Sequence, residues 1–521
     1  MQNPPSKRTS AFLSIAIPLI LSGCATQLQV MSEEAIDERA SSDFTSMFSA
    51  ELPQGETITL SEAIARSIKY NLDNRLKMME SVLAQQTLDL SDFNKLPQLA
   101  LNAGYTVRNR TQASSSLNLG TGVPNFGAST STDNGIVTAD LQASWDTLDF
   151  GIAYINSKQS ADEVLIAIER QRRVTQNIIK DVRYAYWRML GTARLQKSLT
   201  PLLREIKQGL RDSYAAQQAK LKPLEECLEY QRAMLDIQRQ MLSLQREIND
   251  ARINLTAMMG LPPGSQFKID GSTAQTAPYK TNEDFELEQL QQIALRNRPE
   301  LIEEDYKARI ALNEIKKARL KLIPGIEFFT GINHSDNSFL LNEVWAASGY
   351  RFTWDILNFF AGKKDIKRAK ASSEVGDVKR MALSMAVLTQ VEMSLHGLSQ
   401  SKQEYSIASE MNRVDGSLYD QYVNKHNASQ MDHLTVVEAK ARKLLSMLRH
   451  VMAYAEWQNS IGQLYASVGY QPAAVLDYNS ELVPLTEQVQ SYLDAPSFSE
   501  KHGFYVPIEA AKRAGKLKTN G

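Results

Sequence analysis

Several segments of the chain alternate apolar and polar residues with a period of two, which predicts β-strands with one apolar face. The first pair of segments covers about residues 98–109 and 136–148, and the second pair covers about 325–333 and 343–355. Each has roughly the ten residues, with aromatic side chains near its ends, that a strand of a transmembrane β-barrel needs. The pattern therefore favours strands that meet lipid on one face.

Two much longer tracts, about residues 150–260 and 360–468, have the apolar spacing of coiled coils. In the first tract, apolar residues alternate steps of three and four from Met234 to Met258. In the second, they do so from Val437 to Ala455. Helices of this length are not expected in a single soluble core, whereas they are expected in a stalk or in the wall of a tube. We expect each tract to double back once, at Pro223 and at residues 424–430.

A Trp-Asp-x-Leu-x-Phe motif occurs twice, 209 residues apart, and the same offset aligns the two chain segments for more than a hundred residues after it. A shared register of this length indicates a tandem structural repeat. The motif residues are Trp145, Asp146 and Phe150 in the first copy and Trp354, Asp355 and Phe359 in the second.

The part upstream of each strand pair repeats more loosely. Asn71 matches Asn297 at an offset of 226, and Pro97 matches Pro324 at an offset of 227. Each repeat therefore predicts a helix, a proline break, a strand pair, the Trp-Asp motif and a long helical hairpin.

These boundaries predict five parts of the chain. They are a signal peptide at 1–23, a lipid-anchored linker at 24–56, a first repeat at 57–263, a second repeat at 264–475, and a C-terminal equatorial segment with a tail at 476–521. Four strands cannot close a barrel in one chain, and an open sheet in lipid would leave its edges unpaired. The expected fold is thus mixed α and β, with a transmembrane barrel shared between protomers and a coiled-coil tunnel.

The start of the chain resembles a bacterial lipoprotein signal. Lys7 and Arg8 precede an apolar run that ends in Leu-Ser-Gly before Cys24, and that run is too short to span a bilayer. We expect cleavage before Cys24 and acylation, including palmitate, of its thiol. Alanine at position 25 favours delivery to the outer membrane. This covalent lipid is the only non-protein group that the sequence predicts.

Charge and motifs exclude several classes of function. The chain has 58 basic and 59 acidic residues, a balance that gives no reason to expect a nucleic acid partner. It contains no phosphate-binding glycine loop, no nucleophile elbow and no His-Glu-x-x-His sequence. His426 and His433 lie beside a predicted turn, where solvent-facing side chains are a better interpretation than metal ligands. An enzyme is therefore not predicted.

The repeat, the motif after each hairpin, the Arg-Asn-Arg-Pro sequence at 296–299 and the lipobox together resemble the TolC-like outer-membrane efflux protein family, in its lipoprotein branch. The resemblance covers roughly residues 57–475. It implies a homotrimer with a twelve-stranded barrel and a periplasmic helical tunnel, lipid-anchored in the bacterial outer membrane. It also implies two partners, a periplasmic adaptor (membrane fusion) protein and an inner-membrane transporter.

The resemblance also implies a gate at the periplasmic tip. The sequence that starts at Asp432 resembles the family's tip, where an aspartate faces the pore. A second acid of that tip would fall on Thr435, and the equivalent position in the first copy, 209 residues earlier, is Glu226. Three-fold symmetry would turn each acid into a ring of carboxylates that attracts cations. Tyr419, Asp420 and Tyr422, just before the turn, are further candidates for contacts between neighbouring hairpins.

The expected function is a passive exit duct for a tripartite efflux or type I secretion system. Two alternatives stay open, a coiled-coil lipoprotein that braces the envelope and a surface adhesin. The duct is favoured because a brace needs no amphipathic strands and an adhesin needs no matched pair of hairpins. Drug, metal, polysaccharide and protein export all fit such a tube.

Overall fold

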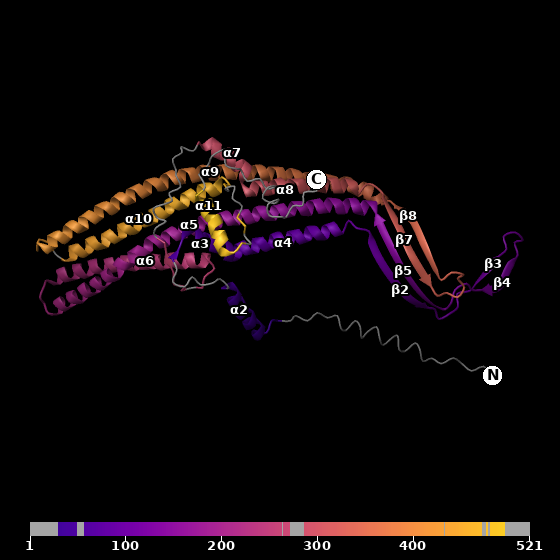
Figure 1. Ribbon diagram of the computed structural model, residues 1–521, viewed down its shortest axis with the longest axis horizontal. Helices are drawn as coiled ribbons and strands as arrows, with labels where there is room; N and C mark the ends of the chain where they lie inside the picture. Colours follow the sequence, from indigo (N-terminus) through magenta and orange to yellow (C-terminus); the bar gives the residue numbers. More distant parts are fainter. Residues whose placement is uncertain are drawn as a thin grey trace. The chain divides into compact units, whose positions relative to one another are not determined.

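The structure is a computed structural model that describes residues 30–48, 57–262, 264–270, 286–431, 433–470, 476–477 and 480–494 (Figure 1). Cys24 and the expected signal peptide lie outside the described residues. The chain divides into two units, Met1–Glu51 and Leu52–Gly521. In the smaller unit, helix α2 (Glu33–Met47) begins at Ser32, whose hydroxyl accepts a hydrogen bond from the Ala35 amide. Among the described helices, none is both long and apolar enough to cross a membrane.

In the larger unit, four antiparallel strands form one sheet in the order β2 (Gln98–Val107), β5 (Gly135–Asp146), β7 (Gly325–Ser335) and β8 (Val344–Thr353). They lie where the sequence alternates, and β5–β7 joins the two repeats. The register pairs Leu101 with Leu141, Leu141 with Ile332, and Ile332 with Ala346. Because side chains alternate between faces, this register gathers the apolar positions of all four strands on one face.

The uncharged segment between β2 and β5, which the sequence predicts as a loop, contains a second small sheet. Strands β3 (Ser114–Leu117) and β4 (Pro124–Ser129) pair with each other. Asn118 organises their turn, since its side-chain oxygen accepts from the amides of Gly120 and Thr121. Both strands are exposed on both faces and lack the apolar alternation, so the periodicity of the sequence does not predict them.

The long helices form two hairpins of equal dimensions. Helices α5 (Thr147–Gln218) and α6 (Leu224–Met258) make the first, and α9 (Ile356–Asn427) and α10 (His433–Ser467) make the second. Both hairpins pair a helix of 72 residues with one of 35 residues. Every boundary in the second hairpin follows its counterpart by 209 residues. Helix α5 is unbroken across Pro201 although proline lacks the amide donor.

The helices upstream of each hairpin also repeat in length. Helices α3 (Leu60–Tyr70) and α4 (Leu72–Phe93) recur as α7 (Leu287–Asn297) and α8 (Pro299–Leu320), 227 residues later. The Asn71–Asn297 match at 226 is therefore displaced by one residue, because the boundary after α3 corresponds to Arg298. The first break is capped by the Asn71 side chain, and the second uses Pro299 at the first helical position.

The helices next to the sheet form a row in the same order as the strands. Helix α4 packs on α5, α5 on α8, and α8 on α9. Two short strands, β1 (Thr57–Ile58) and β6 (Lys268–Ile269), pair in parallel and attach to α5, where the Tyr186 hydroxyl donates to a backbone oxygen of Ile58 or Asp270. Helix α11 (Leu482–Asp494) packs on α3. At one end of the two rows lie β2 and α4, and at the other end lie β8 and α9. Among the described residues, these strands and helices have no further neighbour within their row.

Candidate functional site: a duct wall and its tip

The Trp-Asp motif forms the junction between strand and long helix in both repeats. The Asp146 carboxylate caps α5, since Oδ1 accepts from the amides of Leu148 at 2.7 Å and Asp149 at 3.0 Å. Asp355 does the same for α9, where Oδ1 accepts from the Leu357 amide at 3.0 Å. A carboxylate at this position satisfies amides that would otherwise lack partners and favours the helix dipole.

The motif's aromatic residues lie beside that cap. The rings of Trp145 and Phe150 are 5.3 Å apart between centroids, and Phe150 stacks on Tyr154 at 6.4 Å. Trp145 and Trp354 are both exposed. The side chain of Phe359 lies outside the described residues. Exposed aromatic residues at the end of an apolar sheet face are typical of the boundary between hydrocarbon and water.

The opposite face of the sheet is polar. Glu327 and Arg351 are paired across β7 and β8, with Oε2 and Nη1 2.8 Å apart. Asn102 on β2 donates to Asp140 on β5 at 2.9 Å. Apolar residues on one face and charged residues on the other are what a barrel wall between lipid and an aqueous lumen requires.

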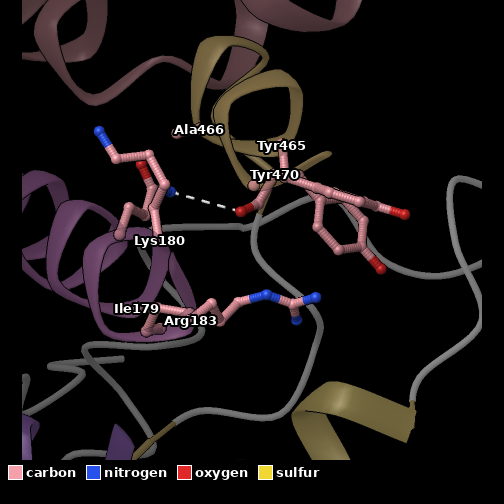
Figure 2. Close-up of a pocket in the computed structure, with 8 residues that line it drawn as sticks. Ile179, Lys180, Arg183, Tyr465, Ala466 and Tyr470 are labelled. Carbon is pink, nitrogen blue, oxygen red and sulfur yellow. Dashed lines mark hydrogen bonds between the residues drawn. The ribbon is translucent and has the colours of Figure 1, made fainter. Parts of the chain in front are cut away.

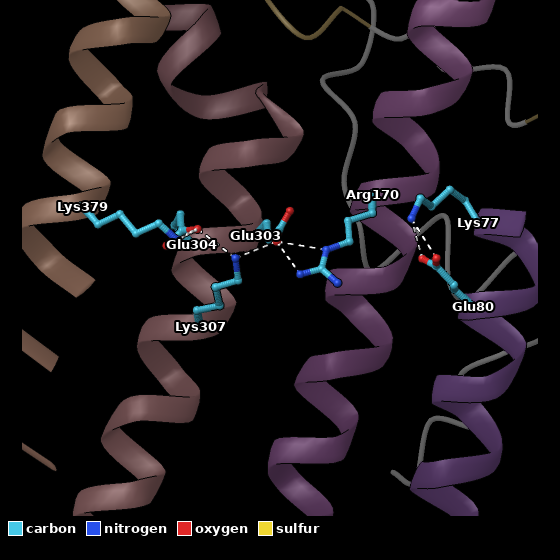
Figure 3. A network of polar contacts seen from close by, with 7 residues as sticks. All are labelled: Lys77, Glu80, Arg170, Glu303, Glu304, Lys307 and Lys379. Atoms are coloured by element: carbon cyan, nitrogen blue, oxygen red, sulfur yellow. Dashed lines mark hydrogen bonds and ion pairs between the residues drawn. The ribbon is translucent and has the colours of Figure 1, made fainter. Parts of the chain in front are cut away.

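A polar network joins the helices of the row, as Figure 3 shows. Glu303 Oε1 on α8 lies 2.8 Å from Arg170 Nη2 on α5, and Glu304 Oε1 lies 3.0 Å from Lys379 Nζ on α9. Lys307 binds both carboxylates, at 2.7 and 2.9 Å. The network fixes three neighbouring helices relative to one another.

These pairs shift the protonation of the carboxyl groups. Burial acts to raise the pKa of Glu303, but hydrogen bonds from Arg170 and Lys307 outweigh it, so the pKa lies below its ordinary value. Burial opposes the same shift at Glu304, where hydrogen bonds from Lys307 and Lys379 likewise hold the pKa below its ordinary value. Both groups are therefore carboxylates at neutral pH.

A small pocket lies where α5 of the first repeat meets the end of α10 in the second (Figure 2). Gln176 on α5 donates to the Tyr470 carbonyl at 3.4 Å, and Arg183 donates to Gln458 at 3.3 Å. Gly462 allows close approach, since a Cβ there would lie 3.2 Å from the Lys180 side chain. The remaining lining residues are Ile179, Tyr465 and Ala466. The pocket marks a contact between repeats.

The two hairpin turns lie at the ends of the hairpins remote from the sheet. Lys220 and Ser429, 209 residues apart, both have positive φ, 55° and 56°. Glu226 lies in the first turn of α6 and forms an exposed ion pair with Lys222. Asp432 lies outside the described residues. The structure therefore describes one of the two predicted gate acids, in the turn where the sequence predicts it.

The other candidate tip residues contact their own hairpin. Lys443 Nζ on α10 lies 3.4 Å from Asp420 Oδ1 and 4.6 Å from the centre of the Tyr419 ring, both on α9. Tyr422 is half-buried. His426 lies 5.8 Å from His433 between ring centroids, and its Nδ1 is 2.8 Å from the Met431 carbonyl oxygen.

Sequence reasoning missed Glu205, which joins the two hairpins. Its Oε2 lies 2.6 Å from Lys440 Nζ and its Oε1 lies 3.4 Å from His433 Nε2, both on α10. The repeat holds a signal for it. At an offset of 209, Val414 replaces Glu205, and Leu224 and Gln231 replace His433 and Lys440. Glu205 lies in the first copy and its two partners lie in the second, and the equivalent positions do not repeat the pairing, which indicates a contact between copies.

Among the described residues, no group of three histidine, cysteine or acidic side chains could hold a metal ion. The arrangement that remains is a wall with an apolar face, a polar face and a pair of helical tips.

Solved outer-membrane channels share this fold. The Campylobacter jejuni CmeC outer membrane channel matches with a TM-score of 0.60 and 13% identity, over 86% of this chain and 94% of that one. The Neisseria gonorrhoeae MtrE outer membrane channel, in its open state, matches with a TM-score of 0.59 and 15% identity, over 79% of this chain and 88% of that one. CusC, whose structures describe the changes that accompany folding and transmembrane channel formation, matches with a TM-score of 0.59 and 18% identity, over 82% of this chain and 96% of that one. The chain thus shares the fold of these outer-membrane channels.

Sequence comparison matches part of the chain to a known family. Residues 79–261 match the model for the outer membrane efflux protein family, and the matched range runs from within α4 to the end of the first hairpin. No curated protein sequence matches the chain. This part of the chain is thus similar to outer membrane efflux proteins, and the whole has the fold of solved outer-membrane channels.

Proposed function

We propose that three copies of the chain close into one duct. The observation that carries this proposal is that strands β2-β5-β7-β8 and helices α4-α5-α8-α9 follow the same order. Among the described residues, the end strands β2 and β8 each have one open edge, and the end helices α4 and α9 each have a neighbour in the row on one side only. If β8 of one copy pairs with β2 of the next, three copies give a closed twelve-stranded barrel above a closed ring of helices. Closure removes the open sheet edges that lipid would not tolerate.

The free face of α4 supports this closure. Six of its apolar side chains are more than half exposed and follow steps of three, four or seven residues: Leu72, Leu76, Met79, Leu83, Leu90 and Phe93. This is the spacing of a coiled-coil seam, which needs a helix against it. In the closed ring that helix is α9 of the next copy.

We infer from the family that the duct works with a periplasmic adaptor protein and an inner-membrane transporter, as the exit of a tripartite efflux or type I secretion system. The chain then acts as a passive conduit and performs no chemistry. We further propose that Cys24 is acylated and holds the chain in the outer membrane, because a basic and apolar leader precedes it.

The proposed gate is at the turns of the hairpins. Glu226 and Asp432 of three copies would form rings of carboxylates around a narrow mouth, which attract cations and repel anions. Glu226 pairs with Lys222 within one turn, so the ring retains its charge only in part.

The test uses the full-length protein in mild detergent and in planar bilayers. Native mass spectrometry should show three chains, and bilayers should show a cation-preferring conductance. Glu226→Ala with Asp432→Ala should weaken the cation preference and leave the trimer yield unchanged. A stable monomer that conducts would contradict the trimer, and a trimer that never conducts would favour a brace or an adhesin over a duct.

A further inference from the structure

Three lysines lie on one flank at the start of α9. Lys363, Lys367 and Lys370 are spaced by four and three residues, which places them on one side of the helix, and all three are exposed. This flank lies to the side of the line of contact with α8. Gly362 and Ile366 turn toward that neighbour, and a Cβ at Gly362 would collide with Leu322 just after α8. We call these residues the α9 lysine cluster.

The first repeat shows which surface this flank belongs to. Trp145 is on the apolar face of the sheet, and contacts from Trp145 to Phe150 and from Phe150 to Tyr154 continue that face onto α5. Lys158 follows, with Nζ 4.4 Å from the centre of the Tyr154 ring. At an offset of 209, Tyr154 corresponds to Lys363 and Lys158 to Lys367. The cluster therefore lies on the flank that continues the lipid face, and not on the flank that continues the polar face.

The cluster is close to the sheet. Helix α9 begins at Ile356, three residues after β8 ends. Lys363 is thus about 10 Å along the helix from its start, and Lys370 is about 21 Å from it. Lysine side chains extend toward a charged surface while their stems stay on apolar surface. Lys363 can reach the headgroup layer directly, and the other two act over a distance comparable with the screening length of about 8 Å.

Two lysines of the cluster have no opposite charge as a partner within the described part of the chain. Among the described residues, Lys367 and Lys370 form no ion pair, and the nearby Asp365 lies 3.6 Å from Arg368 instead. The corresponding positions in the first repeat hold Lys158 and Ala161. The second repeat therefore has more lysines on this flank than the first, close to the sheet.

We propose that the α9 lysine cluster binds the phosphate of anionic lipid headgroups in the leaflet next to the helices. This rests on the proposed function, because it needs the sheet to lie in a bilayer. Each lysine near an anionic lipid surface contributes about fivefold in affinity, and less with distance. We expect the three together to give about a tenfold preference for an anionic lipid over a zwitterionic one.

The test measures lipid retention by the full-length oligomer in native mass spectrometry. The probes are phosphatidylglycerol, phosphatidylcholine and inorganic phosphate. The variant is Lys363→Gln, Lys367→Gln and Lys370→Gln. The matched control, Lys197→Gln, Lys207→Gln and Lys402→Gln, removes the same charge from exposed helix positions more than 45 residues from the helix starts. A Lys→Arg triple variant of the cluster keeps the charge.

The protein and the control should prefer phosphatidylglycerol by about tenfold, the cluster variant should lose that preference, and the arginine variant should keep it. If inorganic phosphate displaced phosphatidylglycerol from the protein and from the cluster variant equally well, the site would bind free anions, and the lipid assignment would be overturned. A cluster variant that still prefers phosphatidylglycerol would also overturn the lipid assignment. So would a cluster variant that no longer forms the oligomer while the control variant still does. Conductance measured on the same variant distinguishes the lipid-binding proposal from the proposed function. A variant that conducts normally but has no lipid preference leaves the proposed function intact.

Discussion

Lys440 on α10 places its Nζ 2.6 Å from Oε2 of Glu205 on α5, so one ion pair joins the hairpin of the second repeat to that of the first. His433, at the start of α10, lies against the other oxygen of the same carboxylate. Both hairpins carry a turn that lies far from the sheet. We expect this contact between the hairpins to limit how far apart their tips can move.

Removing this link should loosen the tips. We expect Glu205→Gln to weaken the contact between the hairpins by about 1 kcal/mol, because the pair is partly exposed, and to raise the open fraction about fivefold. Single-channel conductance measures it. The control is Glu229→Gln on α6, which removes an exposed carboxylate at the same charge cost. Equal open fractions in both variants would show that Glu205 does not restrain the tips.

The network around Glu303 and Glu304 should make stability depend on acid. Both carboxyl groups have a pKa below the ordinary value of 4.5 in the folded chain. A lowered pKa means that their stabilisation is fully present above pH 4.5 and is lost as pH falls through the folded-state pKa. Thermal unfolding followed from neutral to acid pH should show this loss.

Glu303→Gln with Glu304→Gln should lower the free energy of unfolding by about 2 kcal/mol at neutral pH, since hydrogen bonds to charged groups are lost. The same variant should also flatten the acid dependence. Glu374→Gln, an exposed position on α9, should do neither. An unchanged acid slope in the double variant would assign the dependence to other carboxylates.

The caps in the Trp-Asp motif should stabilise the long helices. We expect Asp146→Ala and Asp355→Ala each to cost about 1 kcal/mol in the free energy of unfolding, because each removes a side-chain acceptor from the first turn. Asparagine keeps that acceptor, so Asp146→Asn should cost much less. Chemical unfolding measures the difference. Equal losses for alanine and asparagine would point to the charge of Asp146 rather than to capping.

Gly191 should be needed for the contact between α5 and α10. A Cβ at Gly191 would overlap the Val451 side chain, whereas one at Gly397 meets nothing within 4 Å. Gly191→Ala should therefore destabilise the protein by about 1–3 kcal/mol, while Gly397→Ala should stabilise it by up to about 1 kcal/mol through helix propensity. The melting temperatures of the two variants should move in opposite directions, and a shared direction would refute the close approach.

Periodicity predicts the elements that contact lipid or a coiled-coil partner, because those contacts impose a regular spacing. The strands around Leu101 and Leu141 and the hairpins around Met241 are therefore visible in the sequence. The β3–β4 hairpin is not visible, because its residues contact solvent on both faces. Glu205 is not visible either, because a single ion pair between distant helices imposes no spacing. Only its replacement by Val414 in the second copy marks it.

The equal lengths of the two hairpins have a consequence for how the protein can change. A helix of 72 residues spans about 108 Å, and that span is the depth at which both tips lie below the sheet. Lengthening one hairpin by a heptad would preserve its seam yet offset its tip from the other by about 10 Å. The two hairpins must therefore keep equal lengths for their tips to stay level. We expect such a wall to become longer only when both copies gain the same insertion.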